Sequence, residues 1–427
     1  MGIIGLIALL VFMALGMPIA LCMGLIGFIG LAATTTMEAG LFRVGTAFWT
    51  MTANYTLACL PFFILMGYFA AVSGLTADAY NGARKWLARL PGGLAMTTIW
   101  GCAGFAACTS SSLACCITMA NIALPEMRQH GYDDKLITGS IASGGTLGPL
   151  IPPSGIFVIY GILTEESIGK LFFAGIFPGI LLATLYMITI WIWCKINPKL
   201  GPPGPKTSWR EKLVSIKDLW GILLLFLVVM GGIYSGVFTP TEAASGGALA
   251  ALLMALARGR LTKANIVEGF KDTFRTVGMV YPLIIGATLF GYFMAASGVG
   301  QALASFVSGL NLPTTAILIF IMLVFIILGT AMETMPMMIL LVPILLPCLV
   351  TMGVDLIWFG VMMALMVEMG TISPPTGMNQ FVMSSVARVP LTTVWVGVLP
   401  FCGSVCVCVA FLLAFPQIAL FLPYTMR

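Results

Sequence analysis

Residues 144–155 read Gly-Gly-Thr-Leu-Gly-Pro-Leu-Ile-Pro-Pro-Ser-Gly, and residues 370–379 read Gly-Thr-Ile-Ser-Pro-Pro-Thr-Gly-Met-Asn. Each stretch lies inside an apolar segment of the length that a membrane-crossing helix needs. Proline removes a backbone donor and blocks the preceding helical turn, whereas glycine permits backbone conformations that other residues avoid. The two stretches therefore predict two transmembrane helices that are each broken midway.

The same signals recur at a nearly constant distance along the chain. Pro152–Gly155 return as Pro374–Gly377, with Ser replaced by Thr. Residues 67–74 return at 291–298, with six of eight positions identical, and the distance between these copies is almost the same as in the first pair. A shared distance indicates one ancestral unit of about two hundred residues that was duplicated, an architecture typical of secondary transporters.

The composition predicts an all-α polytopic membrane protein. Of the 427 residues, 60% are hydrophobic and only 8% are charged, against about 25% charged in soluble domains. No basic residue precedes Arg43, so we expect the first apolar segment to be a retained helix and not a cleaved signal peptide. The 11 cysteines lie mostly in apolar stretches and are expected to be small buried hydrophobes. With His130 as the only histidine, no zinc-type spacing exists.

Charge distribution predicts that the second copy is inverted. Residues 76–91 hold three basic residues, while their counterpart, 298–313, holds none. Residues 36–53 hold one, while their counterpart, 258–275, holds five. Because basic loops stay cytoplasmic, corresponding loops are expected on opposite sides of the membrane. This membrane topology places the N-terminus in the periplasm and 17 of the 20 Lys and Arg residues in the cytoplasm. We expect 36–53 and 258–275 to form helices along the two interfaces.

The resulting organisation has two repeats joined by a polar segment. The first repeat is predicted at residues 1–195, the cytoplasmic linker at 196–218 and the second repeat at 219–427. Each repeat is expected to contain one re-entrant helical hairpin and one broken helix, at 91–130 and 136–162 in the first and at 313–354 and 356–383 in the second.

The breaks and hairpin tips are the candidate binding site. The expected tips are Gly104–Ser112 and Gly329–Pro336, and neither they nor the two breaks contain Lys or Arg. Unwound backbone carbonyls and Ser or Thr hydroxyls are ligands that a hard cation accepts, and helix N-termini can hold a carboxylate. Any single Pro or Gly is equally explained by a kink or close packing, and Ser110 and Ser111 by bonds to helical carbonyls. Four symmetric breaks favour a binding site.

Three carboxylates lie in or near the expected membrane region. Glu333 lies at the second tip and is the candidate for ion or substrate coupling. Glu242 follows Thr239 by three residues, so helix capping explains it nearly as well. Glu368 precedes the second break and receives no assigned role. With few carboxylates and no intramembrane histidine, sodium is favoured over a proton as the coupling ion.

Taken together, these residues resemble the large membrane (M) subunit of tripartite ATP-independent periplasmic (TRAP) transporters. The resemblance spans essentially the whole chain, and the segments that carry it are Pro61–Gly67, the Ser-rich first tip, Gly148–Ser154, Phe238–Ala244 and Gly370–Gly377. It implies an elevator-type fold and sodium-coupled import of a small organic anion, namely a carboxylate, a dicarboxylate or an acidic sugar. It also implies a bacterial inner-membrane location and no organic cofactor.

Site residues and partners follow from the same resemblance. It implies sodium ligands at Thr109, Ser112, Gly148, Ile151 and Pro153 in the first half, and at Gly329, Gly370, Ser373 and Thr376 in the second. It implies a substrate site between the tips, near Ser111, Ser154, Thr330, Glu333 and Asn379. Ser373 and Thr376 depart from the residues usual in the family, a change that coordination through backbone carbonyls tolerates. The implied partners are a small membrane (Q) subunit and a periplasmic substrate-binding (P) protein. We expect the binding protein to dock near 36–53, 163–170 and 298–313.

Two other functions compete with this reading. A stand-alone sodium/dicarboxylate symporter of similar fold would share every motif and would differ only in working without a binding protein. An intramembrane hydrolase needs a nucleophile with a nearby base, and the serines at 110–112 have none. We therefore expect the protein not to be an enzyme.

Overall fold

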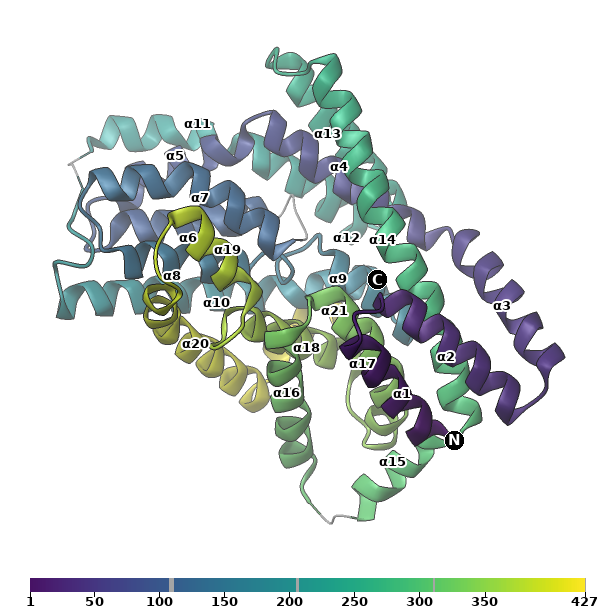
Figure 1. Cartoon of the computed structure of the whole chain (residues 1–427). Helices are drawn as coiled ribbons and strands as arrows, with labels where there is room; N and C mark the ends of the chain where they lie inside the picture. Colours follow the sequence, from purple (N-terminus) through teal and green to yellow (C-terminus); the bar gives the residue numbers. More distant parts are fainter. Residues whose placement is uncertain (107–110, 205–206, 310–311, 427) are drawn as a thin grey trace.

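A computed structural model describes residues 1–106, 111–204, 207–309 and 312–426 of the chain. Across these residues the protein is built of helices, with no strand (Figure 1). Among them, six helices are long and apolar enough to cross a membrane, or seven if one bent pair counts as a single span. The expected all-α membrane fold is confirmed.

The helices divide between the two halves of the chain as follows. Those of the first half are α1 (Gly2–Ala14), α2 (Ile19–Thr34), α3 (Met37–Thr52), α4 (Cys59–Val72), α5 (Leu75–Leu87), α6 (Gly93–Ala106), α7 (Ser112–Gln129), α8 (Asp134–Gly145), α9 (Gly155–Thr164) and α10 (Ile168–Ile196). Those of the second half are α11 (Trp209–Phe226), α12 (Gly232–Tyr234), α13 (Pro240–Ala257), α14 (Lys263–Ala296), α15 (Val299–Gly309), α16 (Thr314–Ala331), α17 (Thr334–Thr351), α18 (Leu356–Ile372), α19 (Met378–Ala387), α20 (Leu391–Ala414) and α21 (Gln417–Thr425).

Helix interruptions occur where proline and glycine predict them. The segment between α8 and α9 covers residues 146–154, and the segment between α18 and α19 covers 373–377. Each contains a cis Pro-Pro peptide bond, Pro152–Pro153 in the first and Pro374–Pro375 in the second. The helical hairpins are α6 with α7 and α16 with α17.

Two segments differ from the expected pattern. Residues 258–275 do not form a separate interfacial helix, because α14 runs without interruption through Lys263–Ala296. Gly278 and Pro282 are both accommodated within the helix. The expected linker 196–218 is also shorter, because α11 begins at Trp209 behind a capping box formed by Ser208 and Glu211.

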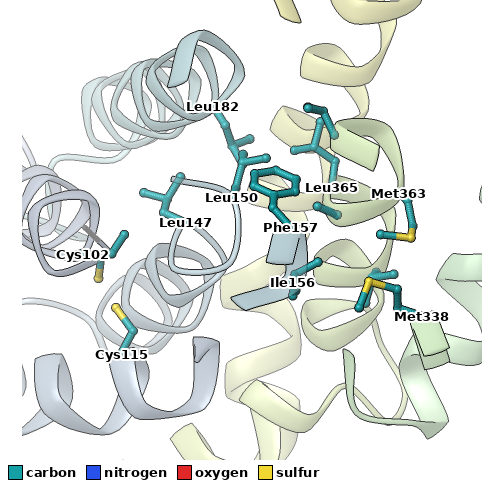
Figure 2. Packing of buried hydrophobic residues seen from close by; sticks show 14 of the residues in the cluster. Cys102, Cys115, Leu147, Leu150, Ile156, Phe157, Leu182, Met338, Met363 and Leu365 are labelled. Carbon is teal, nitrogen blue, oxygen red and sulfur yellow. The ribbon is translucent and has the colours of Figure 1, made fainter. Parts of the chain in front are cut away.

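The two halves pack directly on one another. Helix α19 of the second half lies against α7 and α8 of the first, and α17 lies against α9. Glycines allow the closest crossings: a Cβ atom added at Gly139 of α8 would lie 2.5 Å from the carbonyl carbon of Gly397 in α20. Figure 2 shows the shared core, in which Phe157 of α9 lies beside Leu365 of α18. The two halves therefore share one hydrophobic core.

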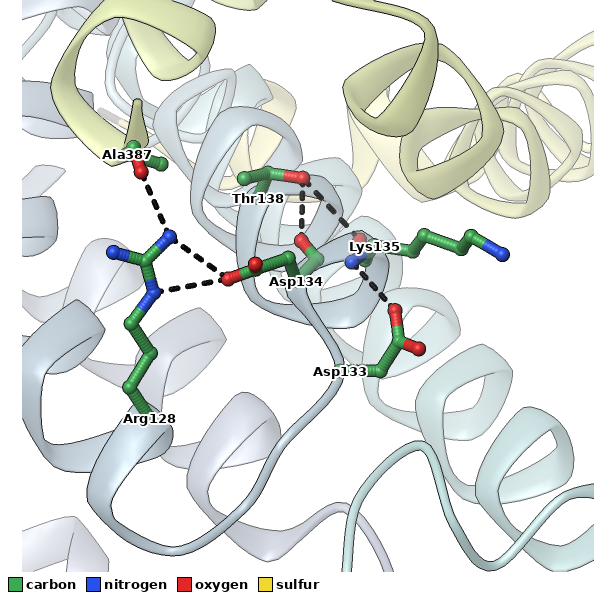
Figure 3. Close-up of polar contacts among 6 residues, drawn as sticks. All are labelled: Arg128, Asp133, Asp134, Lys135, Thr138 and Ala387. Atoms are coloured by element: carbon green, nitrogen blue, oxygen red, sulfur yellow. Dashed lines mark hydrogen bonds and ion pairs between the residues drawn. The ribbon is translucent and has the colours of Figure 1, made fainter. Parts of the chain in front are cut away.

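A polar cluster around Arg128 joins the halves at one end of this core (Figure 3). The Nε and Nη2 atoms of Arg128, at the end of α7, lie 3.0 and 2.9 Å from Oδ1 of Asp134. Nη2 also donates to the carbonyl of Ala387 at the end of α19, at 2.7 Å. Arg128 thus connects the first hairpin, the start of α8 and the end of the second broken helix.

The linker between the halves is bonded to the first half. The amides of Gly92 and Asp133 donate to the carbonyls of Gly201 and Leu200, at 2.9 and 3.0 Å. The amide of Gly204 donates to the carbonyl of Ala88 at 2.8 Å. The Thr207 hydroxyl donates to the carbonyl of Lys85 at 2.7 Å. These bonds fix the linker along the α5–α6 corner.

Candidate functional site

The first break leaves backbone carbonyls without helical partners. The amides of Thr146, Leu147 and Gly148 each donate to the carbonyl three residues earlier, at 3.0–3.1 Å, so the chain tightens before it unwinds. In the described part of the chain, no hydrogen bond reaches the carbonyls of Gly148 or Ile151. Both residues are candidate sodium ligands. Carbonyl oxygens left free in this way can coordinate a cation.

The start of α7 lies next to this break. A Cβ atom added at Gly145, the last residue of α8, would lie 2.8 Å from the carbonyl oxygen of Ser112, the first residue of α7. Ser112 and the first break are therefore neighbours, as a shared cation site requires. The adjoining candidate Thr109 lies outside the described residues.

Free and bonded carbonyls also occur around the second hairpin tip and the second break. A Cβ atom added at Gly370 would lie 2.6 Å from Cα of Gly329, so α16 and α18 touch through their backbones at two candidate ligands. Of the four candidates in this half, Gly329 and Thr376 have carbonyls that accept no hydrogen bond from the described residues. The carbonyls of Gly370 and Ser373 each accept one backbone bond at 3.2 Å.

Several candidate substrate residues use their hydroxyls locally. Ser111 caps α7 by accepting the amide of Ala114 at 3.3 Å. The buried Ser154 hydroxyl donates to the carbonyl of Pro149 and so closes the first break on itself. The Thr330 hydroxyl donates to the carbonyl of Ile327 within its own helix, at 2.8 Å. These bonds give each of the three side chains a structural role beside the expected one.

Among the carboxylates, Glu368 and not Glu333 is the enclosed one. Glu333 is exposed at the N-cap position of α17, whereas Glu368 in α18 is only 2% exposed. Its Oε1 atom accepts a hydrogen bond from the Thr334 hydroxyl at 2.9 Å, and its Oε2 atom has no hydrogen-bond partner among the described residues. Sequence reasoning gave Glu368 no role. The one sequence feature that could have indicated a role for Glu368 is its position as a carboxylate within an apolar segment.

Unpaired buried oxygen atoms concentrate around the two broken helices. Four of the seven buried side-chain polar atoms without a partner in the described chain belong to Ser143, Glu368, Asn379 and Gln380. Asn379 nevertheless uses its amide nitrogen to bond the carbonyl of Ala142 at 3.3 Å, which links α19 to α8. Because an unpaired buried acceptor costs about 1–3 kcal/mol, such a concentration marks a site that a ligand or water completes.

The available ligands suit an alkali or alkaline-earth cation better than a transition metal. In the described residues, no group of three or more His, Cys, Asp or Glu side chains is positioned to hold a metal ion. What the breaks offer instead is neutral carbonyl and hydroxyl oxygen, the ligand type that hard cations prefer.

Glu242 and the cysteines have structural explanations. The Glu242 carboxylate accepts the amide and the hydroxyl of Thr239, at 2.8 and 2.9 Å, in a capping box at the start of α13. Of the ten described cysteines, all are free thiols and only Cys406 is exposed.

Comparisons with known proteins agree with the motifs. The family model described as "Tripartite ATP-independent periplasmic transporter, DctM component" matches residues 6–418. The sialic acid TRAP transporter large permease SiaM of Vibrio cholerae is 34% identical over 371 residues, which cover 87% of this chain and 86% of SiaM. The C4-dicarboxylate TRAP transporter large permease DctM of Pseudomonas aeruginosa is 36% identical over 372 residues, with coverage of 87% and 86%.

A solved structure supports the fold. The YdaH transporter of Alcanivorax borkumensis superposes with a TM-score of 0.65 at 14% identity, covering 89% of this chain and 90% of YdaH. Given the family match across most of its length, the chain belongs to the large permease family of tripartite ATP-independent periplasmic transporters and is a multi-pass inner-membrane protein.

Proposed function

We propose that the protein imports a small organic anion by sodium-coupled secondary transport, with a periplasmic protein delivering the substrate. The observation that carries this proposal is a set of carbonyls that accept no hydrogen bond from the described residues. They belong to Gly148 and Ile151 in the first break, to Gly329 beside the second hairpin tip and to Thr376 in the second break. Sodium is the coupling ion in this proposal because the ligands are neutral oxygen atoms, which bind a hard cation without releasing a proton.

The substrate class follows from the relatives and from the geometry of the tips. The named relatives carry sialic acid and C4-dicarboxylates, and both are organic carboxylates. Helices α7, α9, α17 and α19 all begin at a tip or a break, so the positive ends of their dipoles can attract a carboxylate without a basic side chain. Asn379 of α19 is a buried polar side chain that bonds the backbone of α8. It is the side chain best suited to contribute selectivity for the substrate.

For the transport step, we propose an elevator mechanism acting on two inverted repeats, 1–195 and 219–427. The moving body consists of both hairpins and both broken helices. Contacts of α19 with α7 and α8, and of α17 with α9, support its movement as one piece. The proposed orientation keeps the N-terminus in the periplasm, and family membership implies a small permease subunit as the membrane partner.

Reconstitution tests the proposal. The chain and its small permease subunit are placed in proteoliposomes, and uptake of radiolabelled succinate and sialic acid is measured with and without the binding protein. We expect uptake only with an inward sodium gradient and only with the binding protein. Uptake driven by a pH gradient without sodium would contradict sodium coupling. Sodium-driven uptake without the binding protein would identify a stand-alone symporter instead.

A further inference from the structure

We infer that Glu368 is a positioning residue that joins the tip of the second hairpin to the second broken helix and thereby sets the affinity of the cation site. This inference rests on the sodium-coupled function proposed above. It concerns a side chain that is not among the candidate sodium or substrate ligands.

The Glu368 carboxyl contacts the second hairpin. Its Oε1 atom accepts the hydroxyl of Thr334, the first residue of α17, at 2.9 Å. A single side chain on α18 therefore contacts the residue at which the second helix of this hairpin begins.

The Glu368 carboxyl has one neighbour that favours its charged form. It lies at the start of α17, where the helix dipole attracts negative charge. However, no ion pair in the described structure includes Glu368, and a buried carboxylate without a cationic partner is unfavourable. Its Oε2 atom also has no hydrogen-bond partner in the part of the chain that the structure describes. A cation held nearby would supply the missing charge.

The candidate ligands lie next to this carboxyl. Gly370 follows Glu368 by two residues and touches Gly329 of α16. If the Thr334–Glu368 bond is lost, the start of α17 is no longer fixed to α18. Part of the free energy of cation binding is then used to bring the two helices together, and the affinity for the cation falls.

Sodium-dependent stabilisation of the purified full chain in detergent measures this effect. Melting temperature is followed as sodium chloride replaces potassium chloride at constant ionic strength, because a bound ion stabilises the folded state by mass action. We expect Thr334→Val and Glu368→Gln each to need about tenfold more sodium for the same stabilisation, the loss typical of a hydrogen bond to a charged group.

Two variants serve as matched controls. Thr334→Ser keeps the hydroxyl and should titrate as the unmodified protein does. Thr351→Val lies on the same helix, but the Thr351 hydroxyl bonds only the carbonyl of Pro347, at 2.8 Å, so its removal should leave the sodium titration unchanged. The double variant Thr334→Val/Glu368→Gln should need no more sodium than the weaker-binding single variant, because both changes remove one interaction.

Three results would overturn the inference. One is an unchanged sodium titration in folded Thr334→Val. Another is equal destabilisation of the variants in sodium and potassium, which indicates a purely structural role. The third is additive behaviour of the double variant. If Glu368→Gln does not fold, the sodium titration of Thr334→Val alone tests the inference. Absence of sodium-specific stabilisation in the unmodified chain would remove both this inference and the proposed sodium coupling, a failure distinguishable from one confined to the variants.

Discussion

Gly370 and Gly329 bring two candidate ligands into backbone contact, and this contact is directly testable. Replacing Gly370 by Ala would place a Cβ atom 2.6 Å from Cα of Gly329, so α16 and α18 must separate. We expect the free energy of unfolding to fall by about 1–3 kcal/mol, as for other overpacked contacts, and the stabilisation by sodium to weaken further. Melting curves in sodium and in potassium chloride measure both effects.

Gly246→Ala provides the control for this substitution. Gly246 lies in α13 with no atom within 4 Å of an added Cβ, so alanine there should leave both melting curves as they are. A Gly370→Ala protein with the sodium titration of the unmodified chain would argue against the second cation site.

At the residue scale, the sequence predicts local chemistry and misses distant partners. The breaks near Pro152 and Pro374 were predictable because proline and glycine act on their own backbone. The bond between Thr334 and Glu368 spans 34 residues, and nothing in either local sequence indicates it. For the same reason the sequence favoured Glu333, which lies at the tip, although Glu368 is the carboxylate that the fold encloses.

Among the helices, the crossing of α8 and α20 offers the sharpest test of packing. A Cβ atom at Gly139 would lie 2.5 Å from the carbonyl carbon and 3.0 Å from Cα of Gly397. Gly139→Val should therefore force the helices apart and lower the free energy of unfolding by about 1–3 kcal/mol. Thermal unfolding in detergent provides the measurement.

Gly403→Val on α20 is the comparison for this crossing, since an added Cβ there meets nothing within 4 Å. Equal melting temperatures for Gly139→Val and Gly403→Val would show that the crossing is looser than the structure describes.

Helix boundaries were predictable where an N-cap residue, a proline or a glycine marks them. The sequence did not indicate that α14 continues through Lys263–Ala296, because a change from polar to apolar composition resembles the junction between an interfacial and a spanning helix. It also missed α5, whose residues were treated as a basic loop although Asp78 lies in its first turn and Arg84 and Lys85 in its last, as the helix dipole favours.

For the whole molecule, the proposed inverted orientation of the repeats yields a labelling prediction. Leu90 and Leu312 occupy equivalent positions in the two repeats, and their exposed fractions are 41% and 53%. With Cys406 replaced by Ser, we expect Leu90→Cys to react with a membrane-impermeant maleimide from the cytoplasmic side and Leu312→Cys from the periplasmic side. Intact cells and inverted vesicles provide the two measurements. Reaction of both cysteines from the same side would refute the inversion.

At this scale the all-helical membrane fold was predictable, because composition and hydropathy are properties of the sequence itself. How the halves interlock was not. The placement of α19 on α7 and α8 depends on packing between segments from opposite halves of the chain. The bond from Arg128 to the carbonyl of Ala387 likewise joins positions far apart in the sequence. Neither composition nor periodicity specifies such contacts.

The linker has a mechanical consequence. Because Leu200, Gly201, Gly204 and Thr207 are all bonded to the first half, the described part of the linker acts as a strap held against that half. Thr207 directly precedes the cap of α11 at Ser208, so we expect a displacement of the α5–α6 corner to carry the first turn of α11 with it. Lengthening this segment would uncouple the two ends of the strap without altering either repeat.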